Sequence, residues 1–151
     1  MTYSTHTARA TRTNVQKAAL AVGIVFLAVG LLGFVPGITS NYGSMSFASH
    51  HSDARLLGIF QVSILHNLVH LIFGAAGLAL SRTLSGARNF LVGGGIVYLV
   101  LFLYGLVISK ESAANFVPVN TADDYLHLVL GLGMVALGIA LTRPTAVSRA
   151  A

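Results

Sequence analysis

Four long apolar stretches dominate the chain, and polar or charged residues gather between them. The stretches are Ala18–Val35, Leu56–Leu80, Asn89–Ser109 and Tyr125–Thr142, and none contains Asp, Glu, Lys or Arg. A helix rises about 1.5 Å per residue, so about 20 residues cross a hydrocarbon core of about 30 Å. Strands would be shorter and would alternate polar with apolar positions. The pattern therefore predicts an all-α membrane protein with four transmembrane helices.

The spacing of these stretches also predicts the domain organisation. We expect residues 18–142 to form one transmembrane domain, with residues 1–17 and 143–151 as tails at its two ends. Consecutive helices joined by short segments pack as antiparallel neighbours. The predicted architecture is a four-transmembrane-helix bundle with up-down-up-down connections.

The two halves of the chain resemble each other. The first and third stretches carry GIVFLAVGLLG at Gly23–Gly33 and GIVYLVLFLYG at Gly95–Gly105. The second and fourth share the pattern [Asn/Asp]-x-x-His-Leu-x-x-Gly at Asn67–Gly74 and Asp124–Gly131. Shared membrane composition explains the Leu and Gly matches, but it explains the His with its preceding polar residue less well. We therefore interpret the chain as a tandem duplication of a two-helix hairpin, with a pseudo-two-fold axis along the membrane normal.

Composition supports lipid as the solvent for much of the chain. Hydrophobic residues make up 55% and charged residues only 9%, whereas soluble domains carry about 25% charged residues. The net charge is +5, but the basic residues stand singly at the ends of apolar runs, which argues against nucleic acid as a partner. The absence of cysteine excludes disulfides and thiol chemistry.

The distribution of basic residues predicts the orientation. Most of them precede the first stretch, lie between the second and third, or follow the fourth: Arg9, Arg12, Lys17, Arg82, Arg88, Arg143 and Arg149. Loops rich in Lys and Arg remain in the cytoplasm. We therefore expect both termini to be cytoplasmic and the loops 36–55 and 110–124 to face outward.

Polar residues inside the stretches are the candidates for function, because intramembrane polar groups are costly. They are His66, Asn67 and His70 in the second stretch and His127 in the fourth, with Asp124 directly before the fourth stretch. His66 and His70 share one helix face, and either can face His127 across the bundle. These side chains either hydrogen-bond across helices and hold the bundle together, or bind a transition metal or haem through the imidazoles, with Asp124 orienting His127. The first interpretation is preferred, with no cofactor; the three histidines are weak metal candidates.

Several glycines in the second and fourth stretches predict close packing of helices. Small residues let two helix backbones approach each other within a membrane. The candidates for such contacts are Gly74, Gly77, Gly131 and Gly133.

The motifs that are missing from the sequence indicate the class of function. The chain carries no nucleophile motif, phosphate-binding loop or paired-carboxylate site, so we expect no enzymatic activity. The preferred function is a structural or accessory subunit in a larger membrane complex or a homo-oligomer. The alternatives are a haem- or metal-binding redox protein that uses His66 or His70 with His127, and a small oligomeric transporter or proton-conducting protein.

Three segments carry a resemblance to a known family. LHNLVHLIFGAAGLALSR, GIVYLVLFLYGL and DDYLHLVLGLGM resemble a family of small four-helix bacterial membrane proteins that is classified only as a domain of unknown function. The resemblance covers Val15 to Arg143. It implies a multi-pass protein of the bacterial inner membrane. It implies no reaction, ligand or catalytic residue.

The predicted orientation can be tested by cysteine labelling, because the native chain contributes no cysteine background. We expect Ser85→Cys, between the second and third stretches, to react with a membrane-impermeant maleimide only after cells are opened. Ser112→Cys, in the second outer loop, is the matched control and should react in intact cells. Labelling of position 85 from outside intact cells would contradict the orientation.

Overall fold

The computed structural model describes residues 11–142, which form four helices and a small sheet. The helices are α1 (Asn14–Leu32), α2 (Ile64–Leu80), α3 (Leu84–Val107) and α4 (Thr121–Ala140). The strands are β1 (Thr39–Ser40), β2 (Arg55–Leu56) and β3 (Phe60–Gln61), antiparallel in the order β1-β2-β3, and a 3-10 turn, η1, covers Tyr42–Ser44. The mostly helical fold is confirmed. The first ten residues of the predicted N-terminal tail and the whole predicted C-terminal tail lie outside the described residues.

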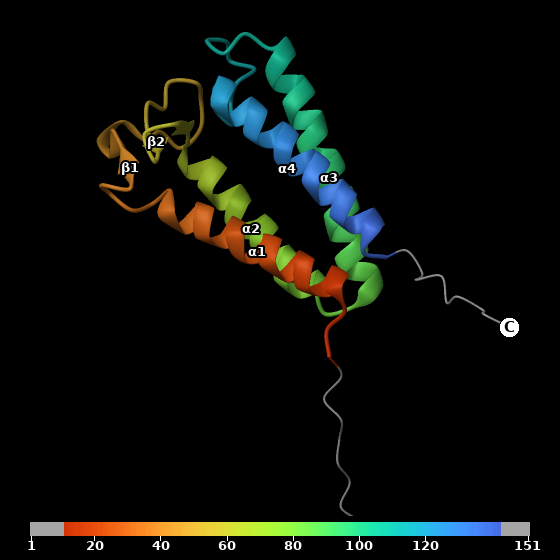
Figure 1. Ribbon diagram of the computed structural model, residues 1–151. Coiled ribbons are helices and arrows are strands. Elements are labelled where there is room, and N and C mark those ends of the chain that lie inside the picture. The colour runs from red at the N-terminus through yellow and green to blue at the C-terminus, as the bar shows by residue number, and fades with distance from the viewer. Residues whose placement is uncertain (1–10, 143–151) are drawn as a thin grey trace, which may run out of the picture.

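Helix length and composition agree with a membrane setting. α1, α3 and α4 are long and apolar enough to cross a membrane, whereas α2 is apolar but has only 17 residues. Figure 1 shows α1 lying along α2 and α3 lying along α4 as two hairpins. The hairpins are joined by the short turn between α2 and α3, and they diverge towards the end that carries the loops and the sheet.

The predicted second span, Leu56–Leu80, is wrong in its first third, where two short strands stand in place of the predicted helix. Residues 55–61 form β2 and β3, joined by a turn in which Leu57 and Gly58 have φ of 54° and 72°. A positive φ is incompatible with a right-handed helix. The helix begins only after Ser63, whose side chain accepts a hydrogen bond from the backbone N–H of His66. The uncharged stretch Leu56–Leu80 therefore contains two different structures, a β-hairpin followed by a helix.

The other helix ends are set by polar caps rather than by the limits of the apolar stretches. α1 starts at Asn14, where Thr13 forms a capping box with Gln16. Thr83 caps α3 and Asn120 caps α4, each accepting from a backbone N–H three residues on. Such caps satisfy donors that the first helical turn leaves free. Each of these helices consequently begins four or five residues before the apolar stretch that predicted it.

Glycine contacts hold each hairpin together. A Cβ added to Gly74 of α2 would lie 2.8 Å from the carbonyl oxygen of Gly23 of α1. A Cβ added to Gly131 of α4 would lie 2.9 Å from the carbonyl oxygen of Gly95 of α3. Gly77 also meets α1, at the Cα of Gly23. The two backbones of each hairpin therefore approach too closely for any side chain at these positions.

Gly133 does not have the predicted close-packing role. It is exposed, and a Cβ there would meet nothing within 4 Å. It lies two residues after Gly131, about 200° around the helix. It consequently points away from the α3 contact that Gly131 makes.

The two hairpins meet through aromatic side chains midway along their helices. Phe26 of α1 and Tyr98 of α3 stack with ring centroids 5.3 Å apart and planes at 20°, and Phe73 of α2 packs edge-on against both. This contact belongs to a buried cluster that comprises Val15, Ala19, Phe26, Ala87, Phe90, Leu91, Tyr98 and Met134. The cluster fills the space between the hairpins at the end opposite the loops.

The glycine contacts can be tested with two alanine substitutions in one helix. We expect Gly131→Ala to lower the free energy of unfolding by about 1–3 kcal/mol, because the added methyl group forces the α3–α4 backbones apart. Gly133→Ala should leave it unchanged or raise it slightly, because alanine favours helix by about 1 kcal/mol over glycine. Unfolding in mixed detergent micelles measures both; equal losses would contradict the assigned contact.

Candidate functional site

Two adjoining cavities lie between the hairpins, on the loop side of the Phe26–Tyr98 stack. The first has a volume of about 180 Å³ and the second about 220 Å³. Both are lined by His66 and His70 of α2 and by His127 of α4. The two cavities, together called the chamber, therefore place buried imidazoles from both hairpins in one space.

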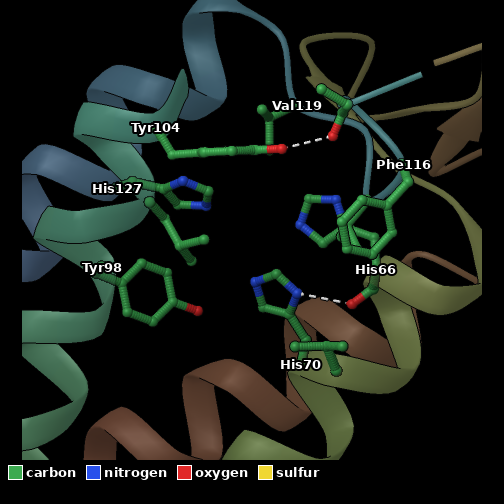
Figure 2. Close-up of a pocket in the computed structure, with 11 residues that line it drawn as sticks. His66, His70, Tyr98, Tyr104, Phe116, Val119 and His127 are labelled. Atoms are coloured by element: carbon green, nitrogen blue, oxygen red, sulfur yellow. Dashed lines mark hydrogen bonds between the residues drawn. The ribbon is translucent and has the colours of Figure 1, made fainter. Parts of the chain in front are cut away.

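Apolar side chains make up most of the chamber wall. Besides the histidines, the first cavity is lined by Val69, Tyr98, Leu101, Tyr104, Ala114, Phe116, Val117 and Val119. The second is lined by Val29, Leu56, Leu57, Phe60, Val62, Asp123, Leu126 and Leu130. Figure 2 shows the three imidazoles and the Tyr98 hydroxyl group turned towards the first cavity. A few polar groups in an apolar wall are typical of small-molecule sites.

His66 and His70 form one wall because they are four residues apart on α2. Their rings stack with centroids 4.7 Å apart and planes at 22°. His66 Nδ1 lies 3.0 Å from the carbonyl oxygen of Pro118, and His70 Nδ1 lies 3.0 Å from the carbonyl oxygen of His66. A carbonyl only accepts, so each Nδ1 carries the proton. In the neutral imidazole each Nε2 then keeps a lone pair.

His127 forms the facing wall and is held by packing. It is 4% exposed, and its ring meets the Tyr98 ring edge-on at 5.1 Å. Its Nδ1 is buried without a hydrogen-bond partner among the residues that the structure describes. The Tyr98 hydroxyl also makes no hydrogen bond within this part of the chain, whereas Tyr104 donates to the Ala114 carbonyl at 2.7 Å. A buried polar atom without a partner costs about 1–3 kcal/mol, so His127 Nδ1 marks a site with unused hydrogen-bonding capacity.

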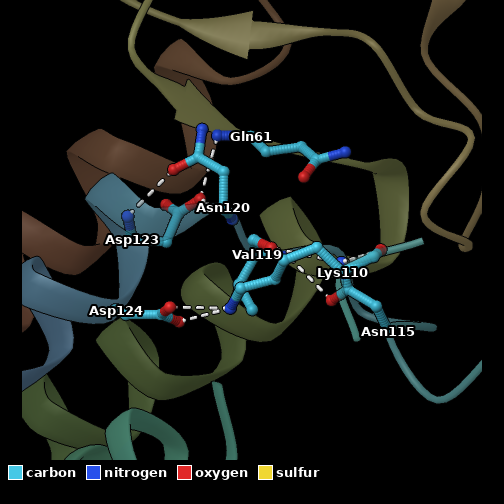
Figure 3. Close-up of polar contacts among 7 residues, drawn as sticks. All are labelled: Gln61, Lys110, Asn115, Val119, Asn120, Asp123 and Asp124. Carbon is cyan, nitrogen blue, oxygen red and sulfur yellow. Dashed lines mark hydrogen bonds and ion pairs between the residues drawn. The ribbon is translucent and has the colours of Figure 1, made fainter. Parts of the chain in front are cut away.

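Hydrogen bonds between the hairpins cover the chamber on the loop side. In addition to the bond from His66 to Pro118, they run from Gln61 N–H to Asp123 Oδ2 (3.0 Å), from Asn120 Nδ2 to the Ile59 carbonyl (2.7 Å) and from Ser49 N–H to the Phe116 carbonyl (2.6 Å). Figure 3 shows Gln61 above the start of α4, beside Asn120 and Asp123. The sheet of the first hairpin is thereby joined to the loop of the second.

Asp124 does not orient His127, contrary to the prediction. Its carboxylate pairs with Lys110 Nζ at 2.7 and 2.8 Å, and its side chain is only 3% exposed (Figure 3). It occupies the space that a Cβ at Gly105 of α3 would need. Asp124 faces α3 and the loop that follows α3. Its partner is therefore Lys110 and not His127, which lies nearer in the sequence.

Asn67 occupies the matching position in the first hairpin. Its side chain fills the space beside Gly33 at the end of α1, and its Nδ2 lies 3.9 Å from the Met45 sulfur. It lines neither cavity. The structure therefore divides the candidate residues: the three histidines line the chamber, while Asn67 and Asp124 serve contacts within their own hairpins.

Two chamber residues, Tyr98 and Asp123, were missed by the sequence prediction. The internal repeat held a signal for both. The register that pairs Asn67 with Asp124 also pairs His66 with Asp123, and the α1–α3 register pairs Phe26 with Tyr98. In the internal repeat, each missed residue thus corresponds to a residue of the other hairpin that lines or borders the chamber.

The geometry gives little support to the haem, metal and proton-conduction alternatives. Across residues 11–142, no three His, Asp or Glu side chains are placed to hold a metal ion together. Each cavity is smaller than the roughly 300–1,000 Å³ that drug-sized ligands occupy, so a haem requires the hairpins to separate. The buried cluster around Phe26 and Tyr98 fills the space between the chamber and the α2–α3 turn. A proton path through the protein would have to cross this apolar layer.

Comparison with known proteins gives one match. A family model described as "Domain of unknown function (DUF4383)" matches residues 16–140. The match spans most of α1 and all of α2, α3 and α4. No curated protein and no solved structure matches the chain significantly.

The Lys110–Asp124 pair can be tested by a double-mutant cycle. Lys110→Met leaves a buried carboxylate without its cation, and we expect a loss on the order of 3 kcal/mol in the free energy of unfolding. Lys110→Met combined with Asp124→Leu should recover most of that loss, since no buried charge remains. Lys17→Met, at an exposed position, is the control and should change stability by less than about 0.5 kcal/mol. Additive losses in the double variant would contradict the pairing.

Proposed function

The chain belongs to the DUF4383 family, a domain of unknown function, and we propose that it is a membrane protein that binds a small lipid-soluble ligand in a non-enzymatic, accessory role. The observation that carries this proposal is the chamber. Buried imidazoles with unused ring nitrogens line an apolar space between the two hairpins.

The membrane setting is supported by the surface of the helices as well as by their length. Large apolar side chains project outward from α2, α3 and α4, with Ile72 70%, Val107 85% and Val129 67% exposed. A soluble monomer rarely exposes apolar surface of this extent. α2 spans about 26 Å, a few ångströms less than a typical hydrocarbon core of about 30 Å, which local thinning or tilt of its neighbours accommodates.

We further propose that the four helices cross the bacterial inner membrane in an up-down-up-down order, with both termini cytoplasmic. In this orientation the α2–α3 turn, which carries Arg82, lies on the cytoplasmic side, as expected for basic residues. The chamber and the sheet then lie towards the outer face. The accessory role is proposed because the chamber contains no arrangement typical of a catalytic nucleophile or of paired carboxylates.

The tandem duplication is supported by contacts that recur in both hairpins. Gly23 meets Gly74 as Gly95 meets Gly131, and Asn67 fills the space beside Gly33 as Asp124 does beside Gly105. The caps of α2 and α4, Ser63 and Asn120, also correspond in the repeat register. The pseudo-two-fold axis then passes between Phe26 and Tyr98 and between His70 and His127. The two cavities correspond across this axis, since Val69 and Leu126 are equivalent, as are Val119 and Val62.

A purely structural role explains only one of the three histidines. His66 hydrogen-bonds to Pro118 of the other hairpin and so ties the hairpins together. His70 bonds only to a carbonyl of its own helix, and His127 Nδ1 has no partner in the described part of the chain. His127 Nδ1, buried without a partner among the described residues, costs stability. A bound ligand would give the free ring nitrogens hydrogen-bond partners.

The ligand-binding role can be tested with benzene, which needs an apolar cavity and no polar contact. Benzene at ten times its dissociation constant should raise the free energy of unfolding by about 1.4 kcal/mol. Val119→Phe, which fills the first cavity and leaves only the second for benzene, should reduce this gain, while Val129→Phe, on the outer surface of α4, should retain it in full. Thermal unfolding in dodecyl maltoside measures all three. Absence of any gain in the wild type, or an equal gain in Val119→Phe, would contradict the proposal.

A further inference from the structure

We propose that the first cavity binds the ring of a lipid-soluble quinol, admitted from the bilayer between α2 and α3. This inference rests on the proposed function and names the ligand class. It follows from the size of the cavity, from the side on which it opens and from the hydrogen-bonding groups of its walls.

The first cavity has room for one substituted six-membered ring. Its volume is about 180 Å³, and a protein cavity of about 150 Å³ is sufficient to bind benzene. A larger fused ring system or a folded acyl chain would not fit. A ligand with a long tail must therefore leave that tail outside the cavity.

The cavity opens towards lipid rather than towards water. Five of its lining residues are also exposed at the surface: Val69, Leu101, Tyr104, Ala114 and Phe116. Side chains that both line a cavity and reach the surface form its mouth, and Val69 and Leu101 place this mouth between α2 and α3. On the loop side, the hydrogen bonds from His66 to Pro118 and from Ser49 to Phe116 close the space. The ligand therefore arrives from the bilayer.

The walls of the cavity suit a neutral ring with hydroxyl groups. No Asp, Glu, Lys or Arg lines the first cavity, so an ionic ligand would lack a counter-charge. On the α2 wall, Nε2 of His66 and of His70 can accept hydrogen bonds. On the facing wall, the Tyr98 hydroxyl and the His127 ring offer further polar atoms. A quinol presents hydroxyl groups at opposite ends of a flat ring, so that both walls are satisfied at once.

The ligand class can be tested by binding measurements in lipid nanodiscs under anaerobic conditions. The probe is a ubiquinol with one isoprene unit, and its di-O-methyl ether is the matched ligand that keeps the ring but cannot donate. We expect the ether to bind at least tenfold more weakly. We expect His70→Leu to weaken quinol binding at least tenfold, and Tyr98→Phe, which keeps the ring, to weaken it severalfold.

The route of access is tested with two tryptophan substitutions. Val69→Trp at the mouth should reduce quinol binding at least tenfold, while Val129→Trp, on the outer surface of α4, should change it less than twofold. Equal binding of quinol and ether, or equal binding by all variants, would overturn the inference. If benzene stabilises the wild type but the quinol does not bind, the inference on ligand class is wrong and the proposed function stands; if neither binds, both fail.

Discussion

The architecture depends on the close backbone approach that glycine permits within each hairpin. Gly23 against Gly74, and Gly95 against Gly131, leave no room for a side chain at these four positions. The aromatic side chains lie between the hairpins. Phe26 and Tyr98 stack between the hairpins, midway along α1 and α3, and set their separation at that level. Towards the loops the hairpins diverge (Figure 1), and the chamber lies in the space between them.

The polar residues divide according to the surface they face. Those turned into a hairpin, Asn67 and Asp124, fill space beside a glycine of the partner helix. Those turned between the hairpins, His66, His70 and His127, line the chamber. Hydrocarbon offers no hydrogen-bond partners, so a polar side chain at membrane depth is favoured where it turns inward. Equivalent positions of the two halves follow the same rule, which explains why one repeat register describes both the packing and the chamber.

The sequence predicted the helices well because each is apolar throughout, and the spacing of His66 and His70 predicted their shared face. It did not predict β2 and β3, since residues 55–61 contain a single charge at Arg55 and are otherwise as apolar as a membrane helix. Gly58 was the only local sign of the turn. The Lys110–Asp124 pair was missed because the partners are 14 residues apart and meet only through the loop after α3. The chamber itself depends on side-chain sizes in both hairpins, which no local pattern encodes.

The central claim is that the imidazoles face one another between the hairpins and are shielded from lipid. Solid-state NMR of histidine- and tyrosine-labelled protein in bilayers measures this directly, with peaks assigned by single His→Gln variants. We expect ring-to-ring correlations between His66 and His70, which lie 4.7 Å apart, and between Tyr98 and His127, at 5.1 Å. His70 and His127 should show no transfer from acyl-chain protons. Strong transfer from acyl chains to either ring, without the ring-to-ring correlations, would contradict the account.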